Sequence, residues 1–103
     1  MKPLTQAERA EILPSLDGWA MVEGRDAIHK RYRFDDFNAA FGWMARVALV
    51  AEQMNHHPDI DIRWRTTSWL LTTHDAGGLT QLDIELAHRI SAAARAEDAQ
   101  PGG

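Results

Sequence analysis

Cysteine is absent from this chain of 103 residues. The protein can therefore form no disulfide bond and no cysteine-ligated zinc site, and it cannot use a thiol as a nucleophile. Long apolar runs are also missing, since none approaches the roughly 20 residues needed to cross a bilayer. The first residues, Met1-Lys2-Pro3-Leu4, lack the apolar stretch of a signal peptide. We therefore expect a cytoplasmic protein with no membrane association.

An excess of positive charge is likewise missing. The formal net charge is −4, from 11 Lys and Arg against 15 Asp and Glu. Only Lys30, Arg31 and Arg33 cluster, which is too little basic surface to bind a phosphate backbone. Direct nucleic-acid binding is therefore not expected. The 45% apolar content and the length instead fit one globular domain spanning residues 1–103.

Polar signals and apolar periodicity divide the chain into helices and strands. Thr5 and Glu8 have the spacing of a capping box and predict a helix up to about Leu13. Alternating patterns predict two hairpins, made of strands over residues 19–23, 27–34, 60–65 and 69–73. In this interpretation Trp64 lies in the third strand and Trp19 begins the first, and both are expected to be core residues.

Two further helices follow from helical spacing. Asp35 or Asp36 can cap a helix over residues 37–54, which Asn55-His56-His57-Pro58 ends. Thr80 can cap a final helix, and residues 93–103 are expected to form a flexible tail. The resulting order, α-β-β-α-β-β-α, predicts an α+β fold in which a four-stranded antiparallel sheet carries three helices on one face.

The helix over residues 37–54 carries two apolar stripes where an amphipathic surface helix needs only one. One stripe contains Phe37 and Phe41, and the other contains Trp43 and Val47. A central helix in a compact monomer would explain this pattern, but so short a chain can hardly cover both stripes. We therefore expect a homodimer or homotetramer, assembled through this helix, through an edge of the sheet, or both.

Three of the five histidines lie between Glu52 and Asp83, and neutral histidine is suited to moving protons near pH 7. His56 and His57 follow the long helix, and His74 lies where a strand ends. The alternative is that the first two are favoured by the helix dipole and that His74 is a surface turn residue. Grouping of all three in one segment favours a functional site.

Two carboxylates accompany these histidines. Glu52 lies four residues before His56, so on a continuous helix it can reach and orient that imidazole. A simple surface pair is the alternative. Asp83 follows Thr80 at capping-box spacing, which gives it a structural role as a cap and can also place it beside the site.

These residues together resemble the pterin-4a-carbinolamine dehydratases. The resemblance rests on one spaced motif, Glu52-x3-His56-His57-Pro58 followed by Trp64, His74 and Asp83, without a departure at these positions. Two flanking stretches also match, namely Phe37-x3-Phe41-x2-Met44-Ala45-x-Val47-Ala48 and Thr73-His74-x3-Gly78-Leu79-x3-Asp83. It covers nearly the whole chain except its two ends.

The resemblance implies a hydro-lyase that removes water from 4a-hydroxytetrahydropterin, giving quinonoid dihydropterin, and so recycles the pterin cofactor of aromatic amino acid hydroxylases. It implies the fold described above, a dimer or tetramer, and no metal or bound cofactor. The implied catalytic residues are His56, His57 and His74, supported by Glu52 and Asp83. The implied pterin contacts are His56, His57, Pro58, Thr73, His74, Asp75, Ala76 and Trp19.

Two other functions remain open at this point. Three histidines and a carboxylate could ligate zinc in a metal-dependent hydrolase, although adjacent His-His ligands are awkward for one ion. Alternatively, the chain could act without catalysis as a protein-binding dimerisation cofactor, as the resemblance to animal members implies. That second function would leave the complete histidine set unexplained.

Overall fold

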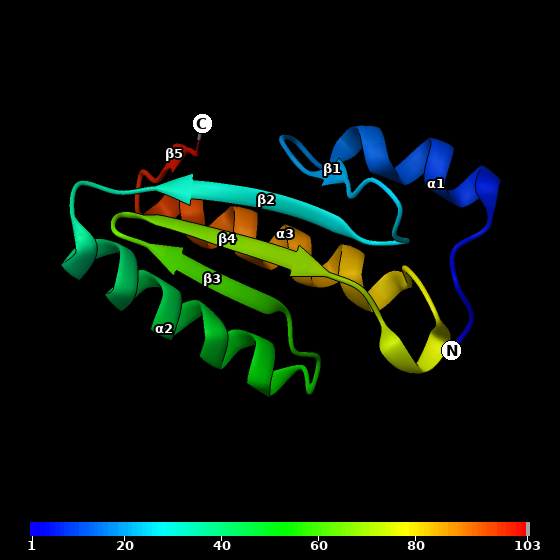
Figure 1. The fold of residues 1–103 in the computed structure, drawn as a ribbon. Helices are drawn as coiled ribbons and strands as arrows, with labels where there is room; N and C mark the ends of the chain where they lie inside the picture. The colour runs from blue at the N-terminus through cyan, green and yellow to red at the C-terminus, as the bar shows by residue number, and fades with distance from the viewer. Residues whose placement is uncertain (103) are drawn as a thin grey trace.

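The computed structural model describes residues 1–102 and has an α+β fold, as predicted (Figure 1). The helices and strands, in chain order, are α1 (Gln6–Ile12), β1 (Ala20–Met21), β2 (Ile28–Arg33), α2 (Phe37–Gln53), β3 (Asp59–Arg63), β4 (Thr66–Leu71), α3 (Gln81–Ala96) and β5 (Gln100–Pro101). Short 3-10 turns cover Leu13–Ser15 and His74–Ala76. No helix among residues 1–102 has the length and apolarity needed to cross a bilayer.

The strands form one antiparallel sheet in the order β1-β2-β4-β3, and β5 adds to β2. The four-stranded antiparallel sheet is therefore confirmed, with β5 as a short fifth strand. Along β4, Thr67, Trp69 and Leu71 are buried, while the residues between them are only half-buried. This alternation places one face of β4 in the core and leaves the other face more open.

Trp43 of α2 joins the helices to the sheet. Its ring centroid lies 5.3 Å from that of Tyr32 on β2 and 5.5 Å from that of Trp69 on β4. Its indole nitrogen donates a hydrogen bond to the carbonyl of Ala93 on α3 at 3.2 Å. The stripe of α2 that contains Trp43 and Val47 is therefore the core stripe. In the other stripe, Phe37 and Phe41 are exposed.

The local capping predictions are confirmed. Thr5 with Glu8 forms a complete capping box at the start of α1, and Thr80 with Asp83 forms another at the start of α3. Asp36, not Asp35, caps α2 by accepting from the amide of Ala39 at 2.8 Å. Such caps depend on residues a few positions apart, which is why the sequence reveals them.

The hairpin between β3 and β4 differs from the prediction. Trp64 does not lie in a strand or in the core: it occupies the turn, with φ 50° and a side chain that is 67% exposed. Arg63 pairs with Thr66, so only two residues connect the strands and β4 begins at Thr66 instead of residue 69. The guanidinium of Arg65 lies 4.5 Å from the Trp64 ring centroid and covers part of it. β1 is also shorter than expected, with only two residues.

The last part of the chain, predicted as a flexible tail, forms helix and strand instead. α3 continues to Ala96 because Ala94 is buried in the core. β5 then pairs with Tyr32 and Arg33 of β2, and the amide of Gly102 donates to the carbonyl of Arg31 at 3.0 Å. The expected flexible tail is therefore not seen up to residue 102, and residue 103 lies outside the described residues.

Candidate functional site

The end of α2 determines how the two adjacent histidines point. Asn55 adopts a left-handed conformation, with φ 52°, and the amide of His56 donates back to the carbonyl of Ala51 at 3.1 Å. This closure turns the chain sharply after the helix. As a result His56 is buried, with 8% exposure, whereas the His57 side chain is 60% exposed.

The buried histidine contacts a buried carboxylate. His56 Nε2 lies 2.6 Å from Oδ1 of Asp83, which is fully buried in the first turn of α3. The other carboxylate oxygen, Oδ2, accepts from the Thr73 hydroxyl at 2.8 Å and from the Thr80 amide at 2.9 Å. Because a carboxylate accepts hydrogen bonds, this contact favours the tautomer of His56 with the proton on Nε2 and the lone pair on Nδ1.

The exposed histidine contacts the other predicted carboxylate. His57 Nε2 lies 2.6 Å from Oε1 of Glu52, and both side chains are exposed. The prediction that Glu52 orients His56 is therefore wrong. It assumed a helix continuing through His56, but the left-handed Asn55 ends the helical spacing and rotates His57 toward Glu52 instead. Each of the two adjacent histidines, His56 and His57, therefore contacts its own carboxylate.

His74 begins the 3-10 turn after β4 and is exposed. The turn is closed at its base by paired backbone bonds, from Thr73 N to the Gly78 carbonyl at 3.1 Å and from Gly78 N to the Thr73 carbonyl at 3.3 Å. Gly77 allows the turn because it adopts φ 78°. Since Thr73 also donates to Asp83, one carboxylate contacts both His56 and the residue preceding His74. Two predicted site residues from separate segments, His56 and Thr73, therefore meet at Asp83.

The remaining predicted contacts lie in different surroundings. Pro58 and Ala76 are half-buried and Asp75 is exposed, each directly beside a candidate histidine segment. Trp19 is buried, and its indole nitrogen donates to Ser91 of α3 at 3.0 Å. That it borders a pterin site stays a prediction.

In the part of the chain that the structure describes, neither a cluster of metal ligands nor the cavity of about 770 Å³ coincides with the predicted site residues. Within residues 1–102, no three His, Asp or Glu side chains lie close enough together to hold one metal ion. This cavity lies elsewhere, lined by residues that include Arg33, Arg46 and Glu97. None of the predicted site residues lines it. His56 and His57 are instead distinguished by the carboxylates that they contact.

Sequence reasoning missed one polar network next to the site. Arg9 and Asp26 form an ion pair beside Leu79, close in sequence to the Thr80 cap. The side-chain hydrogen bond from Arg9 holds the pKa of the Asp26 carboxyl below its usual value, although partial burial opposes this. No local spacing signals the pair, because 17 positions separate the two residues.

Comparison with known proteins gives a consistent result. The family described as Pterin 4 alpha carbinolamine dehydratase matches residues 2–93. A protein of Rhodopseudomonas palustris (strain HaA2), provisionally named a pterin-4-alpha-carbinolamine dehydratase, is 54% identical over 91 residues, covering 88% of this chain and 90% of its own. A Bradyrhizobium sp. (strain ORS 278) protein with the same provisional name is 52% identical over 93 residues, covering 90% and 93%.

Two solved structures share the fold. A Brucella melitensis protein described as a transcriptional coactivator/pterin dehydratase is 43% identical, with a TM-score of 0.85 over 90% of this chain and 99% of its own. A pterin dehydratase-like protein, described as a RuBisCO assembly factor in the alpha-carboxysome, has a TM-score of 0.65 over 75% and 89% of the two chains. At 19% identity this second likeness concerns the fold alone.

Proposed function

Because the chain belongs to the pterin-4a-carbinolamine dehydratase family, we propose that it dehydrates 4a-hydroxytetrahydropterin to quinonoid dihydropterin. The observation that carries the proposal is a set of two histidine–carboxylate pairs, each at 2.6 Å, one of which contacts Thr73 at the base of the loop that bears a third histidine. Such pairs fix the orientation of an imidazole and make it a better base.

Apart from cleavage of one carbon–oxygen bond, the reaction requires only proton transfers. The bond between C4a and the hydroxyl oxygen breaks, and the oxygen leaves as water after it accepts a proton. N5 loses its proton, and the electrons of that N–H bond form the new double bond to C4a. One group must therefore act as an acid and another as a base, each contributing on the order of 10²–10⁴-fold.

The structure supports a division of roles among the histidines. We assign the acid–base pair to His57 and His74, because both are exposed and so are accessible to a substrate. Glu52 orients His57 through the Nε2 contact. His56 is buried except for a small surface, so it assists from the protein side while Asp83 holds it. The pterin edge then contacts the segments 56–58 and 73–76, and Trp19 borders the site.

In this proposal the protein works in the cytoplasm and recycles the pterin cofactor of aromatic amino acid hydroxylases. It functions as a homodimer or homotetramer. The exposed stripe of α2 supports assembly, since Phe37, Phe41 and Leu49 are 50%, 49% and 65% exposed. The Phe37 and Phe41 rings stack with centroids 5.7 Å apart, so these two side chains form one exposed apolar patch.

The proposal is tested by generating 4a-hydroxytetrahydropterin in situ and following its loss by absorbance, with a metal chelator present. Wild type should accelerate dehydration above the spontaneous rate, and His57→Ala and His74→Ala should each lose about 10²-fold or more. His88→Ala is the matched control, because His88 is an exposed histidine on α3 without a predicted role. Folded wild-type protein that gives only the spontaneous rate would contradict the proposal and direct attention to a protein-binding function.

A further inference from the structure

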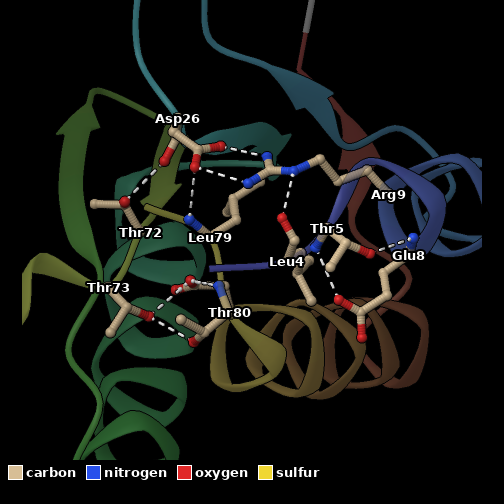
Figure 2. A network of polar contacts seen from close by, with 10 residues as sticks. Leu4, Thr5, Glu8, Arg9, Asp26, Thr72, Thr73, Leu79 and Thr80 are labelled. Carbon is tan, nitrogen blue, oxygen red and sulfur yellow. Dashed lines mark hydrogen bonds and ion pairs between the residues drawn. The ribbon is translucent and has the colours of Figure 1, made fainter. Parts of the chain in front are cut away.

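The loop that carries His74 is held at its base by two different carboxylates. On the inner side, Asp83 accepts from the Thr73 hydroxyl and the Thr80 amide. On the outer side, Asp26 Oδ2 accepts from the amide of Leu79 at 3.2 Å, and the Asp26 carbonyl accepts from the Thr72 hydroxyl at 2.8 Å (Figure 2). Each carboxylate residue therefore contacts both stems of the same loop.

The outer carboxylate is fixed by an arginine from α1. The Arg9 guanidinium makes a two-pronged contact with Asp26, through Nη1 to Oδ1 and through Nη2 to Oδ2 at 2.9 Å (Figure 2). Its Nε donates to the carbonyl of Leu4 at 3.0 Å, and the amide of Leu4 donates to the carbonyl of Leu79 at 2.8 Å. A two-pronged arginine–carboxylate contact restricts orientation more than a single hydrogen bond does. The connection from α1 to Leu79 is therefore double, through Asp26 and through Leu4.

The outer carboxylate leaves no room for a side chain at Gly78. A methyl group built on Gly78 would overlap the Asp26 carboxylate, so that only glycine fits beside it. Gly78 is also the residue that closes the base of the His74 turn by bonding to Thr73. The position of the carboxylate and the path of the loop backbone therefore depend on each other.

From this geometry we infer that Arg9 and Asp26 are positioning residues for His74, acting through the base of its loop. The inference rests on the proposed function, in which His74 takes part in proton transfer. The inference gives Arg9, a residue of α1, a role in catalysis, although α1 otherwise lies outside the site. Geometry matters here because a displacement of about 1 Å at a catalytic group can cost up to about 10²-fold in rate.

The first test compares single variants in two backgrounds. We call the Arg9–Asp26 contact, with Gly78 packed against it, the clasp. Arg9→Met removes its cation, Asp26→Asn removes its anion, and Gly78→Ala creates a steric overlap with it. With His74 present, each should lower kcat about 10-fold with little change in KM. In a His74→Ala background, the same changes should lower the residual rate by less than about twofold, since the group being positioned is gone.

The control variant is Glu97→Gln. It removes the charge from another arginine–carboxylate contact, a single exposed hydrogen bond between Arg46 and Glu97 at 3.0 Å, near the other end of α3 from the Thr80 cap. We expect kcat to stay at the wild-type value. Equal losses from Asp26→Asn with and without His74, or a wild-type kcat in folded Asp26→Asn, would show that the clasp only attaches α1 and would overturn the inference.

A second measurement does not depend on activity. Amide hydrogen exchange at residues 73–78 should become faster in Arg9→Met and Asp26→Asn, and stay unchanged in Glu97→Gln, because the loop base opens more often. If wild type showed no dehydratase activity, the proposed function would fail, yet this exchange result would still report on the clasp. Unchanged exchange in both clasp variants would overturn the inference by itself.

Discussion

Asp83 and His56 are 27 positions apart in the sequence, and their side chains meet at 2.6 Å in the interior. The same carboxylate completes the capping box of α3. A residue with a purely local role in the sequence therefore also joins the segment after α2 to the loop after β4. Removal of Asp83 should consequently affect stability and activity together.

Asp83→Ala should lower the free energy of unfolding by about 3 kcal/mol, because the buried donors of His56, Thr73 and Thr80 lose their acceptor. Urea unfolding measures this change. Glu85→Ala is the matched control on the same helix, since Glu85 forms only an exposed pair with Arg89, and it should change stability by less than about 0.5 kcal/mol. Similar effects of the two substitutions would contradict the role of the buried carboxylate.

Glu52→Gln should reduce kcat about 10-fold while leaving stability almost unchanged. The Glu52–His57 pair is exposed, so its contribution to folding is small, but loss of the carboxylate weakens the base that it orients. Activity and urea unfolding of the same preparation separate these effects. A loss of activity that equals the loss of folded protein would argue against an orienting role.

The Arg9–Asp26 pair should make stability depend on pH in the acid range. Arg9 lowers the pKa of Asp26 in the folded protein, whereas the pKa of this carboxyl in the unfolded chain is about 3.9. The pair therefore stabilises the fold above that unfolded value, and this stabilisation is lost as the pH falls through the lower, folded pKa.

Urea midpoints of wild type and Arg9→Met measure this dependence. The difference between the two proteins should be largest near neutral pH and should shrink below about pH 4. A difference that stays constant down to about pH 2 would show that Arg9 stabilises the protein by packing and not by charge.

Phe41→Glu should shift the proposed oligomer toward smaller species, because it places a charge in the exposed apolar stripe of α2. Analytical ultracentrifugation measures the mass. Asp35→Lys is the control, since Asp35 is an exposed residue just before α2 and not part of the stripe. If wild type sediments as a monomer of 11.6 kDa, the proposed assembly is wrong.

Local features of this fold could be predicted from the sequence, and contacts between distant segments could not. The capping boxes of Thr5 and Thr80 and the periodicity of α2 depend on neighbours within a few positions. The same applies to the helix end before His56. The α+β class, the three helices and the four strands other than β5 follow from these signals.

The pairing of the histidines required the structure. Glu52 was assigned to His56 by helical spacing, but the left-handed Asn55 changed the direction of both imidazoles. Asparagine adopts this conformation more readily than most residues, so the sequence permits the turn at Asn55 but does not require it. The exposed Trp64 follows from the two-residue turn of its hairpin, which alternation alone does not locate.

The short strands β1 and β5 have a consequence for how copies of this sheet can join. On one side the sheet ends in two strands of two residues each, and one of these contains Pro101, which has no amide hydrogen to donate. Within residues 1–102, the other side ends in β3, which has five residues. Strand addition can therefore proceed from one side only, and two copies joined through β3 have no equivalent edge left for a third. Strand addition alone would therefore join two copies and then stop.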